Sequence, residues 1–575
     1  MKIAITGIGI ISAIGNDQRQ IVDALLHEQT GVGTMHYLHS KHTELPVGEV
    51  KMSNEELRQK LSISSSEAIS RTALLGLHAS REALHQAKIT DVSEMAFISG
   101  TTVGGMDTTE RFWSDWQKNK NLDYVSQHEA GATTKTIAQH IGSFAYLMTP
   151  STACSSALNA MIMGANLLRA GKVKKALVGG TESLTCFHLN GFHSLMILDK
   201  ELCRPFDKDR AGLNLGEGAA YVVLESEQEA LARGATILGY VAGYANACDA
   251  FHQTASSEEG EGAFLAMQQA LQMANIEPQA VDYINAHGTG TANNDASESR
   301  AIKRLFGEKL PAISSTKAFT GHTTSASGAI ETAICLLCMQ KGFVPANLHY
   351  QQGDENVIKP VQKTQFQPLQ TVLCNSFGFG GNDSALVLSQ KGVDLADKIT
   401  DFTLQEYVCV VDDLDDYKGY IPPMVARRMT PQTRKMMVAM KKVVQESGIE
   451  PAKIEAIFCA THLGNIEQTA AFLEAMLNEN EQNLPPTLFM NSTHNTVASQ
   501  VAIELKNHHY NITYSDGEKS LESALLDMKT QLELGLIQNA LVLEFDTCEP
   551  KFDAMLQKVG KSSKNMAKAY IYCKK

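Results

Sequence analysis

The sequence predicts an α/β protein built on largely buried sheets. Short apolar runs rich in strand-forming residues alternate with helical patterns, for example at residues 95–100, 176–180 and 219–225. Runs of this kind between helical segments are typical of sheets that are covered on both faces. At 575 residues the chain is too long for one ordinary core. We therefore expect two or three domains.

The composition narrows the class of protein. With 43% hydrophobic and 20% charged residues, the chain has the balance of a soluble globular protein. No run of about 18 apolar residues occurs, so we expect no membrane span. Residues 1–7 have the pattern of a first strand and lack the features of a signal peptide, which favours a cytoplasmic location. The net charge of -13 gives no support to nucleic-acid binding.

The eleven cysteines are scattered, as expected for reduced thiols. Cys335 and Cys338 form a CxxC, but they lie in the apolar helical stretch 333–339, with no second pair or nearby histidine to complete a zinc site. We expect these two thiols to pack in the core, where free cysteine is common.

Six short segments carry the functional signal. One cysteine followed by two distant histidines is suited to moving an acyl group through a thioester. The segments are residues 151–156 (STACSS), 204–207 (RPFD), 287–291 (HGTGT), 317–322 (KAFTGH), Glu331 and 375–381 (NSFGFGG). In this order and spacing they resemble the elongating β-ketoacyl-acyl-carrier-protein synthases of the thiolase-like superfamily.

The resemblance implies a fold and a reaction. It implies a thiolase-like layered αβαβα fold over residues 1–390, in two halves of about 1–240 and 241–390. It also implies an acyltransferase that condenses malonyl-acyl-carrier protein, with loss of carbon dioxide, onto an acyl thioester on Cys154.

Cys154 follows the strand expected at 146–149 and precedes the helical pattern 156–169. Orphan N–H groups and the dipole at a helix N-terminus favour a thiolate, so we expect a lowered pKa. The same N–H groups could stabilise an oxyanion.

His287 and His322 lie beside glycines, after the strand-like runs 282–285 and 311–314. They match the paired catalytic histidines of the family. Decarboxylation of a malonyl thioester produces an enolate, whose oxygen needs nearby N–H donors. The tautomers of the two rings cannot be derived from sequence.

Further site residues follow from the resemblance. Lys317 matches the site lysine of the family and Glu331 its partner carboxylate; the alternative is a solvated surface pair worth roughly 0–1 kcal/mol. Asp295 and Glu298 match acidic positions that would orient the His287 loop.

The substrate channel is predicted in the same way. Thr289 and Thr291 match hydroxyls that bind the pantetheine arm, and Val103 falls at an acyl-pocket position. Phe379 matches a gating aromatic residue whose N–H completes the oxyanion hole. Its flanking glycines would let the loop move, although a tight turn at a strand end also favours glycine. The run 323–328 is more polar than is usual in the family.

The resemblance also bears on cofactors and partners. It implies no metal or redox cofactor, and substrates carried on the phosphopantetheine of an acyl-carrier protein. It leaves open a structural monovalent cation. It implies an acyl-carrier protein as partner, and either a homodimer or a synthase–length-factor pairing within or between chains.

Residues 391–403 are polar and charged and form a candidate linker to a second α/β segment, 404–575. With residues 515–520 aligned on 151–156, identities follow on both sides of the predicted helix: Ala524, Leu532, Gly535, Ala540, Leu541 and Val542 fall on Ala160, Leu168, Gly171, Ala176, Leu177 and Val178. We interpret the segment as a degenerate copy of the amino-terminal half of a synthase, although strand–helix–strand periodicity alone is an alternative.

In this alignment Glu518 replaces Cys154. A carboxylate cannot hold a durable acyl thioester, so the copy should not condense; it resembles chain-length-factor-like partners. We expect residues 512–514 to meet the strand before the nucleophile, in the same chain or a second one. Residues 488–490 would then approach the acyl pocket; the alternative is that they belong only to the core of their own segment.

A basic cluster at 427–428, 434–435 and 441–442 has the pattern of a solvated helix face, or of a docking site for a carrier protein. The fused degenerate half favours polyene or polyketide assembly of the aryl-polyene kind over housekeeping fatty acid synthesis. The alternatives are a non-catalytic, length-determining partner subunit and a coenzyme A-dependent thiolase.

Overall fold

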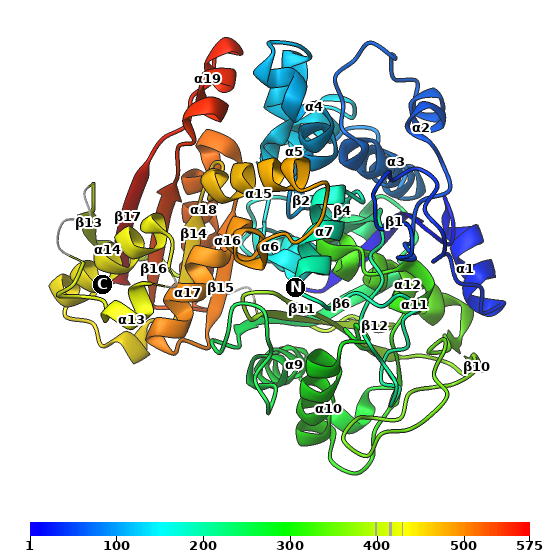
Figure 1. Cartoon of the computed structure of the whole chain (residues 1–575). Helices are drawn as coiled ribbons and strands as arrows, with labels where there is room; N and C mark the ends of the chain where they lie inside the picture. Colours follow the sequence, from blue (N-terminus) through cyan, green and yellow to red (C-terminus); the bar gives the residue numbers. More distant parts are fainter. Residues whose placement is uncertain (397–398, 413–416, 428) are drawn as a thin grey trace.

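The computed structural model describes residues 1–396, 399–412, 417–427 and 429–575. Two residues of the expected linker, 397 and 398, and Arg428 of the basic cluster lie outside the described residues. Figure 1 shows the carboxy-terminal segment, coloured yellow to red, lying beside the first 390 residues.

The first part of the chain carries a mixed sheet of ten strands in the order β3-β2-β4-β5-β1-β6-β12-β11-β7-β8. It consists of two five-stranded halves, joined where Ile3, Ala4 and Ile5 of β1 pair with Val241, Tyr240 and Gly239 of β6. The strands are β1 Ile3–Ser12, β2 Met95–Gly100, β3 Tyr146–Met148, β4 Lys175–Glu182, β5 Gly218–Ser226, β6 Gly239–Cys248, β7 Tyr283–Asn285, β8 Ala312–Ser314, β11 Thr371–Gly378 and β12 Asn382–Ser389. A separate pair is formed by β9 Phe343–Val344 and β10 Gln365–Phe366.

Two buried helices form the central layer between the halves of the sheet. Every residue of α6 (Ser156–Arg169) is buried, as is every residue of α12 (Ser327–Lys341) up to Met339. Helix α3 (Arg71–Gln86) covers the outer face of one half of the sheet, at β1 and β5. Helix α9 (Glu261–Ala274) covers the outer face of the other half, at β6 and β12. The layers are therefore αβαβα, and the fold expected from the sequence is confirmed. Cys335 and Cys338 of α12 are fully buried, as predicted.

The remaining helices lie around these layers and in the carboxy-terminal segment. They are α1 Gln18–Leu26, α2 Asn54–Leu61, α4 Met106–Gln117, α5 Ala130–Gln139, α7 Cys186–Ser194, α8 Glu227–Ala232, α10 Ala292–Phe306, α11 Lys317–Thr320, α13 Pro423–Ala426, α14 Pro431–Ser447, α15 Ile466–Asn478, α16 Pro486–Ser492, α17 Thr496–Leu505, α18 Ser520–Glu533 and α19 Pro550–Lys558.

The carboxy-terminal sheet repeats the amino-terminal half. Its order, β13-β17-β16-β14-β15, corresponds to β1-β5-β4-β2-β3, and each neighbouring pair keeps the same parallel or antiparallel sense. Its strands are β13 Leu404–Val410, β14 Ala456–Ala460, β15 Tyr510–Tyr514, β16 Asn539–Asp546 and β17 Met566–Lys574. The alignment made on sequence maps α6 onto α18 and β4 onto β16 from end to end. The internal repeat is thus a structural one.

The turn that carries the nucleophile is also repeated. The N–H of Thr152 donates to Ser156 Oγ at 2.9 Å, and the N–H of Asp516 donates to Ser520 Oγ at 2.8 Å. In the copy, Glu518 occupies the position of Cys154 and is exposed. The copy therefore keeps the backbone of the turn without its thiol.

The two parts pair edge to edge in the same chain. The N–H of Ser151 donates to the carbonyl of Thr513 at 2.8 Å, and the N–H of Ser515 donates to the carbonyl of Thr149 at 2.9 Å. Because the alignment places Ser515 on Ser151 and Thr513 on Thr149, this contact is isologous, like that of a two-fold dimer. The expected meeting of residues 512–514 with the strand before Cys154 occurs here within one chain.

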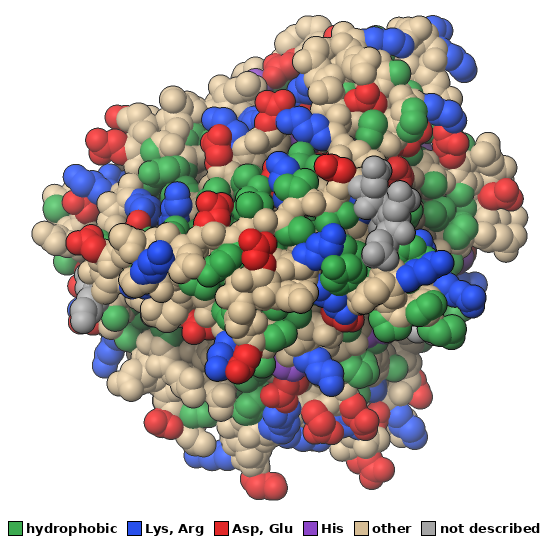
Figure 2. Space-filling view, turned by 90° about the vertical axis from the view of Figure 1, so that its left-hand side faces the viewer, with side chains coloured by type: hydrophobic (Ala, Val, Ile, Leu, Met, Phe, Trp, Pro, Cys, Tyr) green, Lys and Arg blue, Asp and Glu red, His purple; other side chains and the backbone are tan. Residues whose placement is uncertain are grey.

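The basic cluster is engaged locally where it is described. Lys441 forms an ion pair with Glu504, Lys435 donates to the carbonyl of Asp412 at 2.6 Å, and Arg434 lies over Tyr417. Figure 2 shows acidic, basic and apolar side chains interspersed over the face that lies at the left of Figure 1. These contacts favour the helix-face interpretation. In the described part of the chain, no helix is both long and apolar enough to cross a membrane.

Candidate active site

Cys154 lies in a strained turn between β3 and α6. It occupies the 3-10 turn Ala153–Ser155, and Ala153 before it has a φ of 53°, in the left-handed region that non-glycine residues seldom adopt. The carbonyl of Cys154 accepts a hydrogen bond from Ser376 Oγ at 2.9 Å, which ties the turn to β11. The turn therefore presents the thiol from a fixed backbone.

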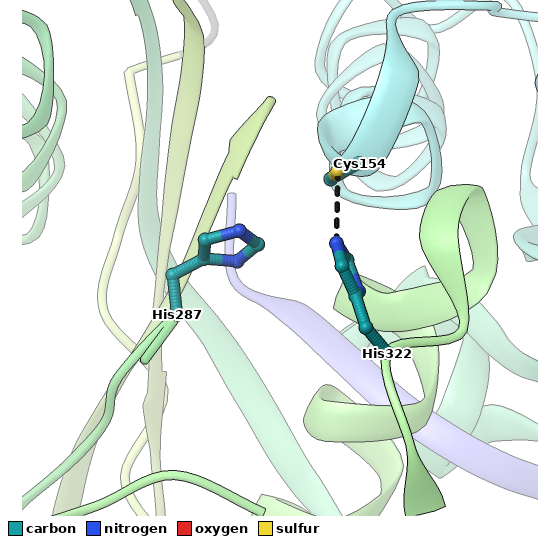
Figure 3. A group of neighbouring side chains, drawn as sticks. All are labelled: Cys154, His287 and His322. Carbon is teal, nitrogen blue, oxygen red and sulfur yellow. Dashed lines mark hydrogen bonds between the residues drawn. The ribbon is translucent and has the colours of Figure 1, made fainter. Parts of the chain in front are cut away.

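Two histidines converge on this thiol. The Sγ atom of Cys154 lies 3.1 Å from Nε2 of His322, and the rings of His322 and His287 meet edge to face with centroids 5.3 Å apart. Figure 3 shows His287 and His322 entering the same space from two different segments, with Cys154 above His322. The loops after β7 and β8, where sequence placed the histidines, thus bring them together.

A buried ion pair stands behind His287. Lys317 Nζ lies 2.5 Å from Glu331 Oε1 and 3.3 Å from Nδ1 of His287, and both charged side chains are almost completely buried. The surface-pair alternative is therefore wrong. Because an ammonium group only donates, Nδ1 of His287 must accept, which leaves the proton of the neutral ring on Nε2.

Both histidines are held in the neutral form. Burial lowers the pKa of His287 and of His322 well below the ordinary value, and the charge of Lys317 lowers each further. Neutral imidazoles can accept a proton at one nitrogen and donate from the other, which is what acyl transfer and enolate stabilisation require.

The expectation of a lowered thiol pKa is wrong for the resting site. Burial raises the pKa of Cys154 to about 12, although the charge of Lys317 and the backbone N–H of Phe379 both act to lower it. The free-energy cost of removing the thiolate from water exceeds the stabilisation that Lys317 and the Phe379 N–H give it. Cys154 is therefore a thiol at rest, and its proton must leave during the reaction.

Two buried carboxylates accept hydrogen bonds from the backbone around His287. Glu298 accepts hydrogen bonds from the N–H groups of His287 and Gly288, both at 2.8 Å. Asp295 accepts from the N–H of Gly290 at 3.2 Å and from that of Phe206 at 2.7 Å. Together they fix the loop that carries His287.

A cavity of about 390 Å³ opens onto the thiol. Its lining includes Cys154, both histidines, Thr289, Thr291 and Phe379. Thr289 Oγ1 and Thr291 Oγ1 lie 2.9 Å apart along this channel. The residues that the sequence assigned to the pantetheine arm and to the gate thus share one channel with the thiol, and their roles stay predictions.

Val103, the residue assigned to the acyl pocket, packs against a cluster of aromatic side chains. Val103 does not line the channel; it packs, half-buried, against a core cluster that contains Phe192 and Phe489. Phe489 of the carboxy-terminal segment meets Phe192 with ring centroids 5.5 Å apart, and Phe192 stacks on Phe379, also at 5.5 Å. The view that residues 488–490 serve only their own segment is therefore wrong for Phe489.

The ligand atoms of Cys154, His287 and His322 lie within 4.8 Å of one another, which is close enough for a zinc-type ion. Among the described residues, His42, Glu44 and His193 form a second such group. The sequence predicts no metal at the thiol, and this stays a prediction.

Comparison with known proteins identifies the family. Residues 1–230 match the family described as "Beta-ketoacyl synthase, N-terminal domain", and residues 238–351 match "Beta-ketoacyl synthase, C-terminal domain". The 3-oxoacyl-[acyl-carrier-protein] synthase 2 of Synechocystis sp. is 32% identical over 414 residues, covering 68% of this chain and 98% of the relative. The chain belongs to the β-ketoacyl synthase family. It is an acyltransferase-class condensing enzyme.

This β-ketoacyl synthase contains a second family match. Residues 409–571 match another family described as "Beta-ketoacyl synthase, N-terminal domain", in agreement with the structural repeat. The ishigamide ketosynthase/chain length factor is 28% identical, with a TM-score of 0.65, over 68% of this chain and 99% of that one. The PfaC keto synthase-chain length factor aligns with all of this chain and 78% of its own, with a TM-score of 0.82; at 18% identity it shows the fold alone.

Sequence reasoning missed residues near Phe379 and Cys154 of this synthase. Phe192, Asn495 and His494 belong to none of the recognised motifs, yet Asn495 Nδ2 donates to the carbonyl of Phe379 at 2.8 Å and His494 Nδ1 lies 2.8 Å from Ser151 Oγ. No signal in a degenerate copy marks such residues, because they act on the other part of the chain. Phe192 lies shortly before the motif at 204–207, and this position alone is only a weak indication that the residue lies near the site.

Proposed function

We propose that the chain condenses malonyl and acyl groups carried on the phosphopantetheine of an acyl-carrier protein, with Cys154 as the acyl-bearing nucleophile. The supporting observation is that Cys154 Sγ lies 3.1 Å from His322 Nε2, with His287 facing the same cavity. We propose an acyl-carrier protein as the donor because a 3-oxoacyl-[acyl-carrier-protein] synthase is among the relatives.

In the acyl-transfer step, the proton of the Cys154 thiol moves to His322 Nε2 as Sγ attacks the thioester carbonyl. The N–H groups of Cys154 and Phe379 hold the oxyanion of the tetrahedral intermediate, since both already act to lower the pKa of the Cys154 thiol. The intermediate collapses by breaking its bond to the carrier sulfur, which takes the proton from His322. The acyl group is left on Cys154.

In the condensation step, the carbon–carboxylate bond of the malonyl thioester breaks and carbon dioxide leaves. The enolate oxygen accepts from Nε2–H of His287, the tautomer that the Lys317 contact imposes, and His322 borders the same space. The enolate carbon then attacks the acyl-Cys154 carbonyl. A carbon–carbon bond forms, the carbon–sulfur bond breaks, and the Cys154 thiolate takes a proton from water.

The resemblance leaves open a structural monovalent cation, and the site contains oxygen atoms of the kind that bind such an ion. Glu331 Oε2 and the amide oxygens of Asn285 and Asn375 are buried and accept no hydrogen bond from the residues that the structure describes. Such oxygens are the ligands that hard cations prefer. These three residues would hold it, and it would neutralise buried oxygen atoms without entering the reaction.

We further propose the domain division 1–390, 391–403 and 404–575, with the last unit as a length-determining partner fused in cis. Phe489 closes the aromatic cluster beyond the gate, where a growing acyl chain would have to pass. The similarity to a ketosynthase/chain length factor supports this, and with it a polyene- or polyketide-type product.

Reconstitution with malonyl-acyl-carrier protein and a panel of acyl-carrier proteins tests the function. We expect β-ketoacyl-carrier products from the wild type and none from Cys154→Ala, while His287→Ala should accept an acyl group and fail to condense it. Products formed only from coenzyme A thioesters would favour the thiolase alternative. No product from any donor would favour the non-catalytic partner.

A further inference from the structure

The backbone of the gate residue, Phe379, has polar contacts on both sides of its Cα atom. On one side, Phe379 lines the same cavity as Cys154, and its backbone N–H acts to lower the pKa of the Cys154 thiol. On the other, the carbonyl of Phe379 accepts a hydrogen bond of 2.8 Å from Nδ2 of Asn495. Asn495 comes from the carboxy-terminal segment, where it precedes α17, and it is 3% exposed. The degenerate copy therefore touches the residue that borders the reacting atoms.

The turn after Phe379 fits closely against the same helix. A Cβ atom on Gly380 would lie 2.8 Å from Asn495 Nδ2 and 3.1 Å from the Cβ of Ser499, one turn along α17. Gly380 also has a φ of 89°, which favours glycine. The turn thus rests on the start of α17 with no space between them for a side chain.

The ring of Phe379 has a second connection to the carboxy-terminal segment. It stacks on Phe192 with centroids 5.5 Å apart and planes 18° apart, and Phe192 meets Phe489 of α16. The backbone connection through Asn495 is direct, whereas the ring connection passes through Phe192. The direct connection can therefore be removed without disturbing the aromatic cluster.

We propose that Asn495 is a positioning residue of the condensing site: its amide holds the Phe379 carbonyl, in the peptide unit that follows Phe379, and this fixes the backbone torsions that keep the neighbouring Phe379 N–H aimed at the thioester oxygen. This inference rests on the proposed function and adds a second task for the carboxy-terminal segment. The segment completes the geometry of the oxyanion donor, and gate movement must break or carry the Asn495 bond.

Two substitutions of Asn495 distinguish the positioning role from a helix-capping role. Asn495→Asp keeps the shape of the side chain and is favourable at the start of a helix, but an ionised carboxylate cannot donate to the Phe379 carbonyl and repels it. Asn495→Ala removes the donor without adding repulsion. A helix-capping role predicts that Asp is tolerated better than Ala. The positioning role predicts the opposite order.

The measurement is the rate of acyl transfer to Cys154 in the full-length chain, followed by rapid quenching and intact mass at several acyl-carrier concentrations. We expect the maximal rate to fall about tenfold in Asn495→Ala, as the loss of one buried hydrogen bond implies. It should fall further in Asn495→Asp, with the half-saturating carrier concentration unchanged. Ser499→Ala, on the same helix and without a hydrogen bond to the gate, is the matched control.

Each outcome bears on one claim. Wild-type rates in Asn495→Asp, or a smaller loss in Asn495→Asp than in Asn495→Ala, would overturn the positioning role, as would an equal loss in Ser499→Ala. A change confined to the half-saturating concentration would assign Asn495 to carrier binding and overturn it as well. If the wild type itself never acylates Cys154, the proposed function fails, which is a distinguishable result.

Discussion

Among single residues, Cys154 differs from an ordinary thiol at a helix N-terminus because burial raises its pKa. The strand–turn–helix context was predictable from the motif, and it led to the expectation of a lowered pKa. Burial raises the pKa to about 12 instead, because the turn is closed over by β11 and the two histidine loops. Desolvation depends on residues far away in the sequence, so no local pattern could supply its magnitude.

Alkylation of Cys154 tests this thiol. Because the thiolate is the reactive form, its rate of reaction with iodoacetamide should rise about tenfold per pH unit from about pH 7 to about pH 10, without a plateau. Peptide mass spectrometry distinguishes Cys154 from the other cysteines. A plateau near neutral pH would show that the thiolate forms there and that the high pKa is wrong.

The Lys317–Glu331 pair should behave as a unit. Lys317→Met leaves a buried, unpaired carboxylate, and breaking such a pair costs about 3–5 kcal/mol. The double variant Lys317→Met/Glu331→Leu removes both charges and should be more stable than Lys317→Met alone, while remaining inactive because Nδ1 of His287 loses its donor. Denaturant unfolding measures the stabilities. Additive losses in the double variant would contradict the coupling.

At the scale of elements, the repeat was the most predictable feature. Identities at Ala540, Leu541 and Val542 set the register that maps β4 onto β16, since core strands keep their apolar residues even without activity. The contact of Asn495 with the carbonyl of Phe379 was not predictable. It depends on how α17 sits against a loop more than a hundred residues earlier, and a lone asparagine before a helix is usually only a cap.

The aromatic cluster predicts an effect on product length. Phe489→Ala removes the ring that meets Phe187 and Phe192, which opens space beside these two rings. We expect the product distribution to shift to longer chains, at a cost of about 3–5 kcal/mol in stability. Mass spectrometry of the carrier-bound products measures the shift. Leu541→Ala, in the core of the carboxy-terminal sheet, is the control for stability loss; an equal shift there would remove Phe489 from length control.

At the scale of the whole molecule, the two parts share buried contacts throughout. The ring of Phe552 stacks on Trp113 with centroids 5.9 Å apart, and two large core clusters contain residues from both parts. Truncation after Asp401 should therefore give an aggregated chain, or one that dimerises through the uncovered edge at Ser151. Light scattering after gel filtration measures this. A monodisperse, fully active monomer with unchanged product length would contradict the pairing.

An ion bridge between the parts predicts acid sensitivity. Burial alone would raise the pKa of Glu129, but His462 and Lys561 of the carboxy-terminal segment outweigh it and hold the pKa at about 2. A depressed pKa stabilises the fold above the unfolded value of about 4.5, and the contribution is lost as the pH falls toward 2. Glu129→Gln should flatten this part of the stability curve in thermal unfolding. An unchanged acid slope would show that the bridge contributes nothing.

The proposed chemistry depends on Cys154 carrying the acyl chain. Its most direct test is the intact mass of the protein after mixing with acyl-carrier proteins of several chain types, for the wild type and for Cys154→Ala. We expect one acyl adduct on the wild type, none on Cys154→Ala, and a preference for particular acyl groups. An adduct that persists in Cys154→Ala, or no adduct on the wild type with any carrier, would contradict it.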